Sequence, residues 1–441
     1  MEKMISIARG MRDVLPEEQK YWAYLRSVTQ TRLQSFGFQP IDTPIVEPKD
    51  LYLRGAGKES DIVQKELFAV SRTGSRGEDE PQDESNTRDL VLRPEGTAGF
   101  VRAYIEHGMR TWSQPVKLYS FVQNFRYDRP QKGRYRQHTQ INVEVFGDET
   151  PLTDAMTLLA LWQIIQDLQL DDQLVIELNS IGDKACRGQI RTALKAYYEP
   201  LLPHLCKQCQ ERFHSNPLRL LDCKQAECQQ YREAAPATID SLCTECRAHF
   251  MLVLEYLDEA GVPYDLNHYL VRGLDYYTRT TFEIRHRDDS HRQAVLGGGG
   301  RYDDLVEALG GQPTPAFGFG LGMERVVEKL IDRGIEVKPL MSTEILVIQL
   351  GDRAKKKAIP LLVSLSKKGL AASMALGKES LKSQLRSADK MGAKLALIVG
   401  EREAIDGTII VRNMFDGTQD TVAFDDVEMV IERKLAELAQ D

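Results

Sequence analysis

The sequence predicts an α+β protein in which helices flank an antiparallel sheet, with a cysteine-rich insertion and a C-terminal α/β domain. Three observations support this architecture. The stretch HTQINVEVFG (138–147) alternates polar and apolar side chains, which is typical of a half-buried strand. Six of the seven cysteines lie between residues 206 and 246. After residue 342, the apolar stretches EILVIQL and KLALIVG are separated by helical segments, a pattern typical of α/β domains.

Size and composition indicate a large cytoplasmic protein. A chain of 441 residues, 42% of them apolar, can bury two or three cores. The N-terminal stretch MEKMISIARGMRD is charged, and no apolar run reaches the roughly 18 residues that a membrane helix needs. We therefore expect no membrane contact. The net charge of -8 argues against nucleic-acid binding by bulk attraction, so local clusters of positive charge become the informative feature.

The elements before the central hairpin have structural roles only. Residues 17–35 carry apolar side chains at helical spacing behind Pro16, which suits a helix start. The stretch FGFQPIDTPIVE contains two prolines in an apolar run and is expected to be an edge or interface strand. The polar, acidic segment 72–89 is expected to be a disordered hairpin tip without chemistry.

The central hairpin presents a polar working surface. On its second strand, HTQINVEVFG (138–147), three apolar side chains alternate with Gln140, Asn142 and Glu144. One face is therefore apolar, and the other carries amides and a carboxylate. The following stretch TDAMTLLALWQIIQDL has the spacing of an amphipathic helix that covers the apolar face.

The loop of this hairpin concentrates positive charge. Six side chains were counted as cationic: Arg126, Arg129, Lys132, Arg134, Arg136 and His138. Planar arginine suits phosphate oxygens, and Tyr135 offers a face on which a base could stack. The alternative is a loop that is merely solvated by its charges. The segments LRPEG (92–96) and GMER (322–325) add arginine beside glycine and glutamate, and such convergence favours a phosphate site.

Five segments together resemble the signature segments of the histidyl-tRNA synthetase family, which belongs to the class II aminoacyl-tRNA synthetases. They are RPEGT, FRYDRPQKGRYRQ, LVRGLDYYTRTTFE, GGGGRYDDL and GFGLGMER. The resemblance runs from RGMRDVLP (9–16) to the C-terminus, and LVRGLDYY is specific to the histidine enzymes. It implies a class II antiparallel sheet and ATP-dependent attachment of L-histidine to tRNA through a histidyl-adenylate. Its alternative is the related regulatory subunit of ATP phosphoribosyltransferase, and a third possibility is a purely RNA-binding protein.

The resemblance also implies roles for individual residues. Arg126 and Arg272 are the expected catalytic residues, on opposite sides of the α-phosphate, where fixed guanidinium groups offset the charge that develops in the reaction. The expected ATP-binding residues are Arg126, Arg134, Tyr135 and Arg325. The expected histidine-binding residues are Glu95, Gly96, Thr97, Arg126, Gln140, Glu144, Arg272, Tyr276, Tyr277 and Tyr302. Within this set, Glu144 and Tyr277 are the expected imidazole ligands, and Tyr302 has the alternative role of a packing tyrosine.

Glycine runs and cysteines need separate explanations. AFGFGLG and GGGGRYDD match neither a dinucleotide fingerprint nor a P-loop, so we expect backbone to pass close beneath a ligand.

Two C-x2-C pairs, Cys206–Cys209 and Cys243–Cys246, could hold a structural zinc. Cys223 and Cys228 would then be spare or alternative ligands, and Cys186 a small core residue. Ordinary reduced cysteines remain the alternative.

The resemblance assigns domains and partners. The expected catalytic domain comprises 1–185 and 262–333, the insertion domain 186–261, and the anticodon-binding domain 342–441. Between residues 353 and 394, 11 basic residues meet two acidic ones, which suits either tRNA contact or a solvated helix face. The implied partners are histidine tRNA, read at its extra 5′ guanosine and its anticodon, with L-histidine and ATP as its Mg²⁺ complex. A second copy would form a homodimer through the segment around Pro44.

Overall fold

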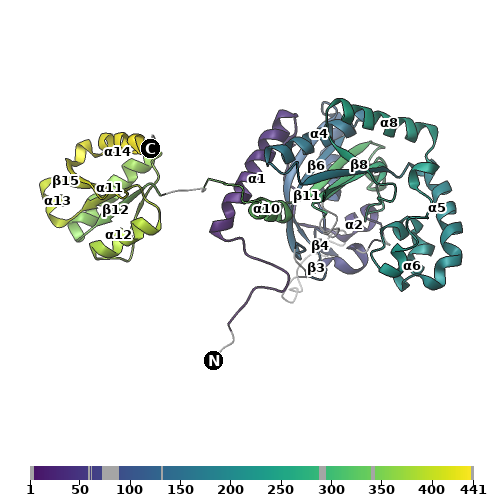
Figure 1. Cartoon of the computed structure of the whole chain (residues 1–441), viewed down its shortest axis with the longest axis horizontal. Coiled ribbons are helices and arrows are strands. Elements are labelled where there is room, and N and C mark those ends of the chain that lie inside the picture. Colours follow the sequence, from purple (N-terminus) through teal and green to yellow (C-terminus); the bar gives the residue numbers. More distant parts are fainter. Residues whose placement is uncertain are drawn as a thin grey trace, which may run out of the picture. The chain divides into compact units, whose positions relative to one another are not determined.

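The chain forms two compact units, Met1–Val337 and Lys338–Asp441, in this computed structural model (Figure 1). The structure describes residues 4–57, 60, 62–71, 89–130, 133–287, 295–338 and 343–438. The predicted acidic hairpin tip lies outside these residues except for Asp89, and so does Lys132 of the basic run. Among the described helices, none combines the length and the apolar character that crossing a membrane requires.

An eight-stranded, mainly antiparallel sheet forms the centre of the first unit. Across the sheet, the strands are β1 (Gln39–Pro40), β5 (Val116–Phe125), β6 (Gln137–Phe146), β11 (Ala316–Gly322), β10 (Gly297–Arg301), β9 (Thr278–His286), β7 (Leu174–Ser180) and β8 (Tyr264–Leu266). Only the outermost pairs at each edge, β1 with β5 and β7 with β8, are parallel. The predicted antiparallel sheet is confirmed.

The predicted hairpin is the pair β5 and β6, whose register runs from Val116 opposite Phe146 to Phe125 opposite Gln137. Its apolar alternation also holds: the side chains of Ile141, Val143 and Val145 lie in the main core. Because side chains alternate along a strand, Gln140, Asn142 and Glu144 lie on the opposite face. The working surface therefore faces away from this core.

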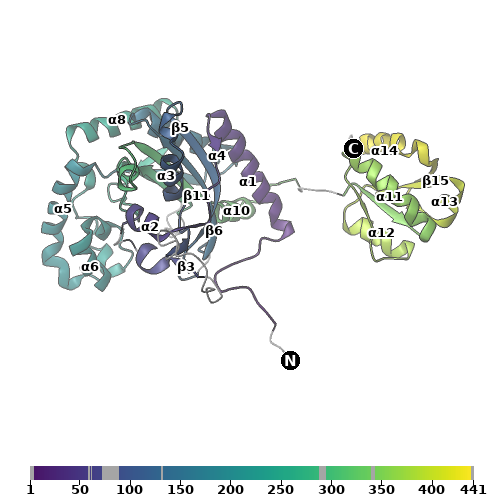
Figure 2. The ribbon, with the colours of Figure 1, turned by 180° about the vertical axis from the view of Figure 1, so that it is seen from behind.

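Helices cover the core face of the sheet. They are α1 (Pro16–Ser35), α4 (Pro151–Asp167), α8 (Thr244–Glu259) and α10 (Met323–Asp332). Both views place α1 and α10 on one side of the sheet and α2 and α6 on the other (Figures 1 and 2). Helix α1 begins at a proline, which fits the first helical position because its missing N–H would have no partner there.

The opposite side of the sheet carries shorter elements. They are α2 (Lys49–Gly55), the π-helical turn Ile62–Glu66, α3 (Thr97–Glu106), the 3-10 turn Met109–Thr111, α9 (Leu305–Ala308), and a small sheet of β2 (Val46–Pro48), β4 (Leu90–Leu92) and β3 (Phe68–Val70). The two-proline stretch was predicted as one strand. It instead contributes β1 to the edge of the large sheet and β2 to the small one. The intervening segment includes Pro44, which lacks a donor for a ladder.

The cysteine-rich insertion is helical and lies in the chain between the neighbouring strands β7 and β8. Its elements are α5 (Lys184–Tyr198), the 3-10 helices η3 (Glu199–His204), η4 (Pro217–Asp222) and η5 (Thr238–Ser241), α6 (Lys207–Ser215), α7 (Ala226–Gln229) and α8. Phe250 and Val253 of α8 join the main core. The insertion is thus fixed to the sheet by its last helix.

The second unit is an α/β domain with a five-stranded sheet in the order β13 (Ala372–Met374), β12 (Ile345–Gln349), β14 (Leu395–Val399), β15 (Thr408–Asn413) and β16 (Gln419–Ala423). β12 runs parallel to β13 and β14. Its helices are α11 (Asp352–Lys367), α12 (Leu381–Lys390), α13 (Glu401–Asp406) and α14 (Val427–Glu437), with the 3-10 turn Phe424–Asp426. The two predicted apolar strands are β12 and β14, and every residue of both is buried.

A buried ionic network ties the catalytic sheet to its covering helices. Arg301, at the end of β10, is fully buried, and its Nε lies 3.0 Å from Oδ1 of Asp154 on α4. His249 of α8 places Nε2 2.9 Å from the other oxygen of Asp154. The guanidinium also donates to the carbonyls of Asp148 (3.0 Å) and Thr150 (3.1 Å). Because every charge is paired, the network holds β10, α4 and α8 in one arrangement.

Replacing Asp154 by Ala should lower the free energy of unfolding by about 3–5 kcal/mol, because it leaves a buried guanidinium without its counter-charge. Urea unfolding followed by circular dichroism would measure the change. The matched control is Asp50→Ala, which removes an exposed carboxylate 4.0 Å from Arg54 and should leave the unfolding midpoint unchanged. Equal midpoints for Asp154→Ala and the parent would show that the network does not stabilise the fold.

Candidate active site

The polar face of the sheet forms the floor of a cavity of about 390 Å³. Its lining comes from segments far apart in the sequence: the end of β4, the β5–β6 loop, β6, the 272–277 loop, β9, β10, β11 and the start of α10. The predicted residues that line it are Glu95, Thr97, Arg126, Arg134, Tyr135, Gln140, Arg272, Tyr276, Tyr277 and Arg325. Ten of the side chains predicted as site residues therefore line the same cavity.

Neutral backbone oxygens hold two of these arginines in place. Arg126 donates from Nε to the carbonyl of Pro94 at 2.7 Å. Arg325 donates from Nε to the carbonyl of Gly133 at 2.9 Å and from Nη1 to the carbonyl of Val295. Carbonyls fix the direction of a guanidinium without forming an ion pair with it, so its positive charge remains directed at this end of the cavity.

The electrostatics of Arg325 report that potential. Burial lowers its pKa, and the nearby charges of Arg134 and Arg126 lower it further, which outweighs the opposite effect of Glu328 and Glu324. Arg134 is less enclosed and lies 3.5 Å from a carboxylate oxygen of Asp128. A polyanion that entered here would relieve the repulsion among these guanidinium groups.

His138 does not contribute charge to this cluster, contrary to its inclusion among the six cationic side chains. Burial lowers its pKa to about 3, and the charges of Arg126 and Arg325 act in the same direction. The ring is therefore neutral at physiological pH. The basic sequence alone could not show that the His138 side chain is buried.

Arg272 occupies a different electrostatic environment. Its Nη1 lies 2.6 Å from Oε1 of Glu283 on β9, and its guanidinium carbon lies 5.6 Å from the ring centre of Tyr277. Burial is the largest single effect and opposes its charged form, but Glu283, Tyr277 and Tyr276 together outweigh burial and raise the pKa. The second oxygen of Glu283 accepts from Arg285 at 2.6 Å. Arg272 is thus held by an ion pair, unlike Arg126 and Arg325.

Sequence reasoning missed Glu283, which also lines the cavity. Strand alternation could have found it: Phe282 and Ile284 of β9 lie in the main core, so Glu283 faces the other way, toward the cavity. Asn142, Lys224 and Glu324 are further lining residues that were not predicted as site residues. Burial raises the pKa of Glu324 to about 7, although its Oε1 accepts from the backbone N–H of Thr139 at 2.7 Å.

Glycines of β10 and β11 leave room for charged side chains as well as for a ligand. A Cβ on Gly298 would lie 2.7 Å from Nη1 of Arg272, and one on Gly318 would lie 1.7 Å from Oε2 of Glu144. The predicted close passage of backbone is therefore found, but the space beneath these two glycines is filled by protein. Only glycine permits an arginine and a glutamate to lie flat against the sheet at these positions.

Three predicted histidine ligands, Gly96, Glu144 and Tyr302, do not line the cavity. Glu144 lies beneath its floor, fully buried. Its Oε1 accepts from Thr97 Oγ1 (2.8 Å) and Asn142 Nδ2 (3.4 Å), and its Oε2 from the Tyr302 hydroxyl (2.5 Å). Burial raises the pKa of Glu144 to about 8, and these hydrogen bonds only partly oppose that effect.

Glu95 lines the cavity and also caps the start of α3. Its carboxylate accepts from the backbone N–H of Thr97 at 2.7 Å and of Ala98 at 3.0 Å, which satisfies unpaired donors of the first helical turn. Burial raises the pKa of Glu95, while the two backbone donors and Arg126 lower it. The same side chain therefore caps a helix and faces the cavity.

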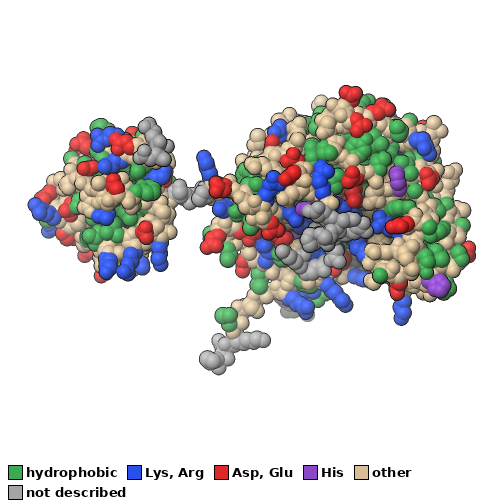
Figure 3. Space-filling view, viewed as in Figure 1, with side chains coloured by type: hydrophobic (Ala, Val, Ile, Leu, Met, Phe, Trp, Pro, Cys, Tyr) green, Lys and Arg blue, Asp and Glu red, His purple; other side chains and the backbone are tan. Residues whose placement is uncertain are grey.

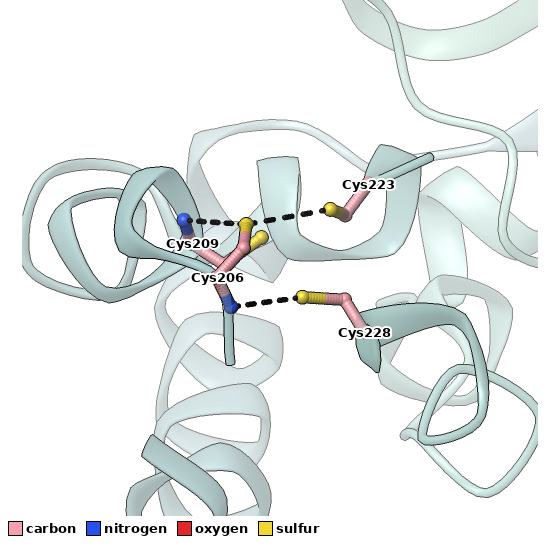
Figure 4. Close-up of side chains that lie close together, drawn as sticks. All are labelled: Cys206, Cys209, Cys223 and Cys228. Carbon is pink, nitrogen blue, oxygen red and sulfur yellow. Dashed lines mark hydrogen bonds between the residues drawn. The ribbon is translucent and has the colours of Figure 1, made fainter. Parts of the chain in front are cut away.

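The predicted pairing of the cysteines is wrong. Cys206 and Cys209 gather with Cys223 and Cys228 (Figure 4), whereas Cys243 and Cys246 gather with Cys186 and Asp183. Each C-x2-C pair lies at the start of a helix, Cys206–Cys209 at α6 and Cys243–Cys246 at α8. The other ligand atoms near each pair come from neighbouring elements and not from the second C-x2-C pair. Cys223 and Cys228 are therefore not spare, and Cys186 belongs to a cluster.

Comparison with known proteins gives a consistent result. The family model for histidyl-tRNA synthetase matches residues 10–326, and the model for an anticodon binding domain matches residues 344–434. A histidine–tRNA ligase of Dehalococcoides mccartyi is 42% identical over 432 residues, which cover 98% of this chain and 100% of the relative. One of Desulforamulus reducens is 40% identical over 426 residues, which cover 97% of this chain and 98% of the relative.

Solved structures agree. The crystal structure of apo S. aureus histidyl-tRNA synthetase is 34% identical, covers 96% of this chain and 98% of its own, and has a TM-score of 0.78. A Bacillus halodurans structure described as an ATP phosphoribosyltransferase regulatory subunit/histidyl-tRNA synthetase is 21% identical, covers 91% of this chain and 99% of its own, and has a TM-score of 0.61. The second likeness shows the fold alone.

The raised pKa of Glu144 makes stability depend on pH. Between its ordinary value near 4.5 and about 8, the folded chain keeps a proton that the unfolded chain releases, so raising the pH lowers the free energy of unfolding. Glu144→Gln removes this dependence. Relative to the parent, the variant should gain up to about 1.4 kcal/mol per pH unit between pH 5 and 8.

Urea unfolding at a series of pH values would measure the difference. The control variant Glu106→Gln removes an exposed carboxylate that pairs with Arg102, and its curve should run parallel to that of the parent. Parallel curves for Glu144→Gln and the parent would contradict the raised pKa.

Proposed function

This chain belongs to the histidyl-tRNA synthetase family, and on that premise we propose how its cavity serves the reaction. The reaction is the ATP-dependent attachment of L-histidine to its tRNA. The histidine carboxylate attacks the α-phosphorus of ATP, which enters as its Mg²⁺ complex, and pyrophosphate leaves. The histidyl group then passes from the adenylate to the terminal adenosine of tRNA, and AMP leaves. The observation that carries the proposal is that Arg126, Arg272 and Arg325 line one cavity.

The two alternatives fit less well. The ligase relatives align with both units of the chain over almost its whole length, which disfavours a regulatory subunit. A purely RNA-binding protein would need neither a cavity lined by four arginines nor the ion pair between Arg272 and Glu283. Histidine-dependent exchange of pyrophosphate into ATP separates the three, because only the ligase catalyses it.

The phosphates of ATP would lie against the arginines. Arg126 and Arg272 approach the α-phosphate from two sides, and Arg134 and Arg325 hold the outer phosphates, with the adenine against Tyr135. Displacement at phosphorus moves negative charge toward pyrophosphate, and fixed guanidinium groups stabilise that charge without reorganising. The carbonyl partners of Arg126 and Arg325 support these roles, because such partners fix position without neutralising charge.

The imidazole of histidine would lie between Tyr277 and the position of Glu144. Asn142 and Thr97 line the cavity and both donate to Oε1 of Glu144, so this oxygen faces the cavity side while Oε2 faces Tyr302. The 3.4 Å contact from Asn142 is the weaker of the two. A ring nitrogen could replace it, which would bring Glu144 into the histidine site. Tyr302 then orients the carboxyl, and Gly96 leaves space for Asn142.

The α-amino group of histidine would be held by Glu95, Thr97 and Gln140, with Tyr276 as a wall. Gln140 Oε1 already accepts from Asn124 at 2.7 Å, which fixes the amide. An apolar slot alone could not reject amino acids of similar size, whereas buried polar groups do so because a wrong ligand leaves them unpaired. The polar character of this end supports its assignment to histidine.

The C-terminal unit would contact tRNA. Lys382, Arg386 and Lys390 of α12 are exposed, and blue side chains gather at the edge of this unit beside α12 (Figures 1 and 3). Leu381 and Leu385 lie among them in an open depression, which offers apolar contact beside the charges. Cations next to an apolar surface suit a nucleic-acid loop with unstacked bases. We place the anticodon contact at α12.

Domain limits and assembly complete the proposal. We retain a catalytic domain of 1–185 and 262–333, an insertion of 186–261 and an anticodon-binding domain of 342–441, and place the enzyme in the cytoplasm with its tRNA. A homodimer would form around Pro44. Ile45 and Val46 beside it are 40% and 39% exposed, and Arg93 holds the backbone there through the carbonyl of Thr43 at 2.8 Å. Apolar side chains on a fixed backbone favour association.

Replacing Arg272 by Gln should lower the rate of histidine-dependent pyrophosphate exchange by about 10²–10³-fold and change KM for ATP much less, because its charge acts mainly in the transition state. Steady-state exchange kinetics would measure both quantities. The control is Arg285→Gln, which also removes a partner of Glu283 but does not line the cavity. An equal loss of rate in the two variants would assign the effect to the charge network instead of to contact with the substrate.

Replacing Lys382 and Arg386 together by Gln should weaken tRNA charging about tenfold at low salt and reduce the salt dependence by about two ion equivalents. Pyrophosphate exchange should stay unchanged, since it needs no tRNA. The control Arg433→Gln removes an exposed charge on α14, outside the basic segment. A double variant that charges tRNA as well as the parent does would show that α12 is only a solvated helix face.

A further inference from the structure

Four cysteines of the insertion converge from separate elements. Cys206 precedes α6, Cys209 lies in its first turn, Cys223 follows η4, and Cys228 lies in α7. Their sulfur atoms all lie within 4.8 Å of one another, and those of Cys206 and Cys223 are 3.8 Å apart. In Figure 4 the side chains point toward a common centre. A disulfide needs about 2.05 Å between sulfurs, so this pair is not bonded.

The spacing fits a tetrahedral metal centre. Zinc bonds to thiolate sulfur at about 2.3 Å, and the edge of such a tetrahedron is about 3.8 Å. The distance between the sulfur atoms of Cys206 and Cys223 equals that edge. Four sulfur ligands in a tetrahedron select zinc or iron over magnesium and calcium, which prefer oxygen.

Backbone N–H groups donate to two of the four sulfur atoms. The backbone N–H of Cys209 donates to Cys206 Sγ at 3.4 Å, and that of Cys206 donates to Cys228 Sγ at 3.3 Å. Cys209, Cys223 and Cys228 are buried, which excludes competing water. Backbone donors outside the ligand sphere orient and stabilise bound sulfur.

We propose that Cys206, Cys209, Cys223 and Cys228 bind one structural Zn²⁺ as thiolates. The ion cross-links three short elements, which are α6, the end of η4 and α7. Metal binding stabilises such a module because its ligands are gathered only in the folded state.

The position of this centre connects it with the catalytic cavity. Lys224 follows Cys223 directly and lines that cavity. On the preceding turn, Arg219 donates from Nη1 to the carbonyl of Gly273 at 2.6 Å, and Asn216 donates to Asp275 at 2.7 Å. The zinc therefore fixes the turn that supports the loop of Arg272. It performs no chemistry itself.

The second cluster provides a matched control. Asp183, Cys186, Cys243 and Cys246 also bring their ligand atoms within 4.8 Å. Its carboxylate, however, already caps α5 by accepting from the backbone N–H groups of Ala185 (3.0 Å) and Cys186 (3.2 Å). Capping by a side chain explains this aspartate without a metal. Substitution of Cys243 therefore tests whether zinc depends on the first cluster alone.

Metal analysis of the reduced full-length chain tests the proposal. The parent should retain about one zinc per chain after dialysis, as expected for a closed structural site. Cys223→Ser and Cys228→Ser should lose it, while Cys243→Ser should keep it. Cobalt exchanged into the parent should give the intense visible and near-ultraviolet bands of a tetrahedral thiolate complex, and these should disappear in Cys228→Ser.

Cys228→His guards against the possibility that the serine variants simply fail to fold. Imidazole is a zinc ligand, so this variant should bind zinc again, whereas a cysteine that served only for packing would not be replaced by histidine. The proposal would be overturned by a parent without zinc or thiolate–cobalt bands. Zinc that survives Cys223→Ser, or is lost only in Cys243→Ser, would overturn it as well.

Discussion

The catalytic cavity depends on positive charge that the protein holds in place without neutralising it. Arg126 and Arg325 are fixed by carbonyl oxygens, and the pKa of Arg325 is lowered by burial and by the neighbouring charges of Arg134 and Arg126. Keeping such groups together opposes folding, so the rest of the sheet must stabilise them. In the proposed function, the phosphates of ATP supply the compensating negative charge and meet donors that already point in the right direction. Neutral His138 between them adds no repulsion.

The sheet can hold these groups because its central strands carry almost no side chains on one face. On β10 and β11, Gly298 and Gly318 accommodate Arg272 and Glu144, which a single methyl group would displace. Glycine in a strand normally weakens it. Here the neighbouring Arg301 network, buried and fully paired, anchors the same strand to α4 and α8. The strand is thus secured from its apolar side and left open on its polar side.

Much of this arrangement was predictable from the sequence, for identifiable reasons. Strand alternation alone placed Gln140 and Glu144 on one face, and the paired strands confirm it. Strand alternation could not predict how deeply each side chain is buried. Glu144 lies below the floor of the cavity, and His138 is buried and neutral. The cysteine pairing failed for a related reason. Sequence spacing identifies which cysteines share a turn, as Cys206 and Cys209 do, but the partner pair depends on how η4 and α7 fold back.

The distribution of charge also explains how an acidic protein handles polyanions. A net charge of -8 repels nucleic acid over most of the surface, which discourages binding in unproductive places. The few basic surfaces then act as exceptions to that background. One is the arginine end of the cavity, where cations are buried and aimed; the other is α12, where Lys382 and Arg386 are exposed. Buried cations stabilise a phosphate only at short distance and in the correct geometry. Exposed cations attract a polyanion over a Debye length of about 8 Å. In the proposed function, the first kind of surface binds the reacting phosphates, and the second binds the charged backbone of tRNA.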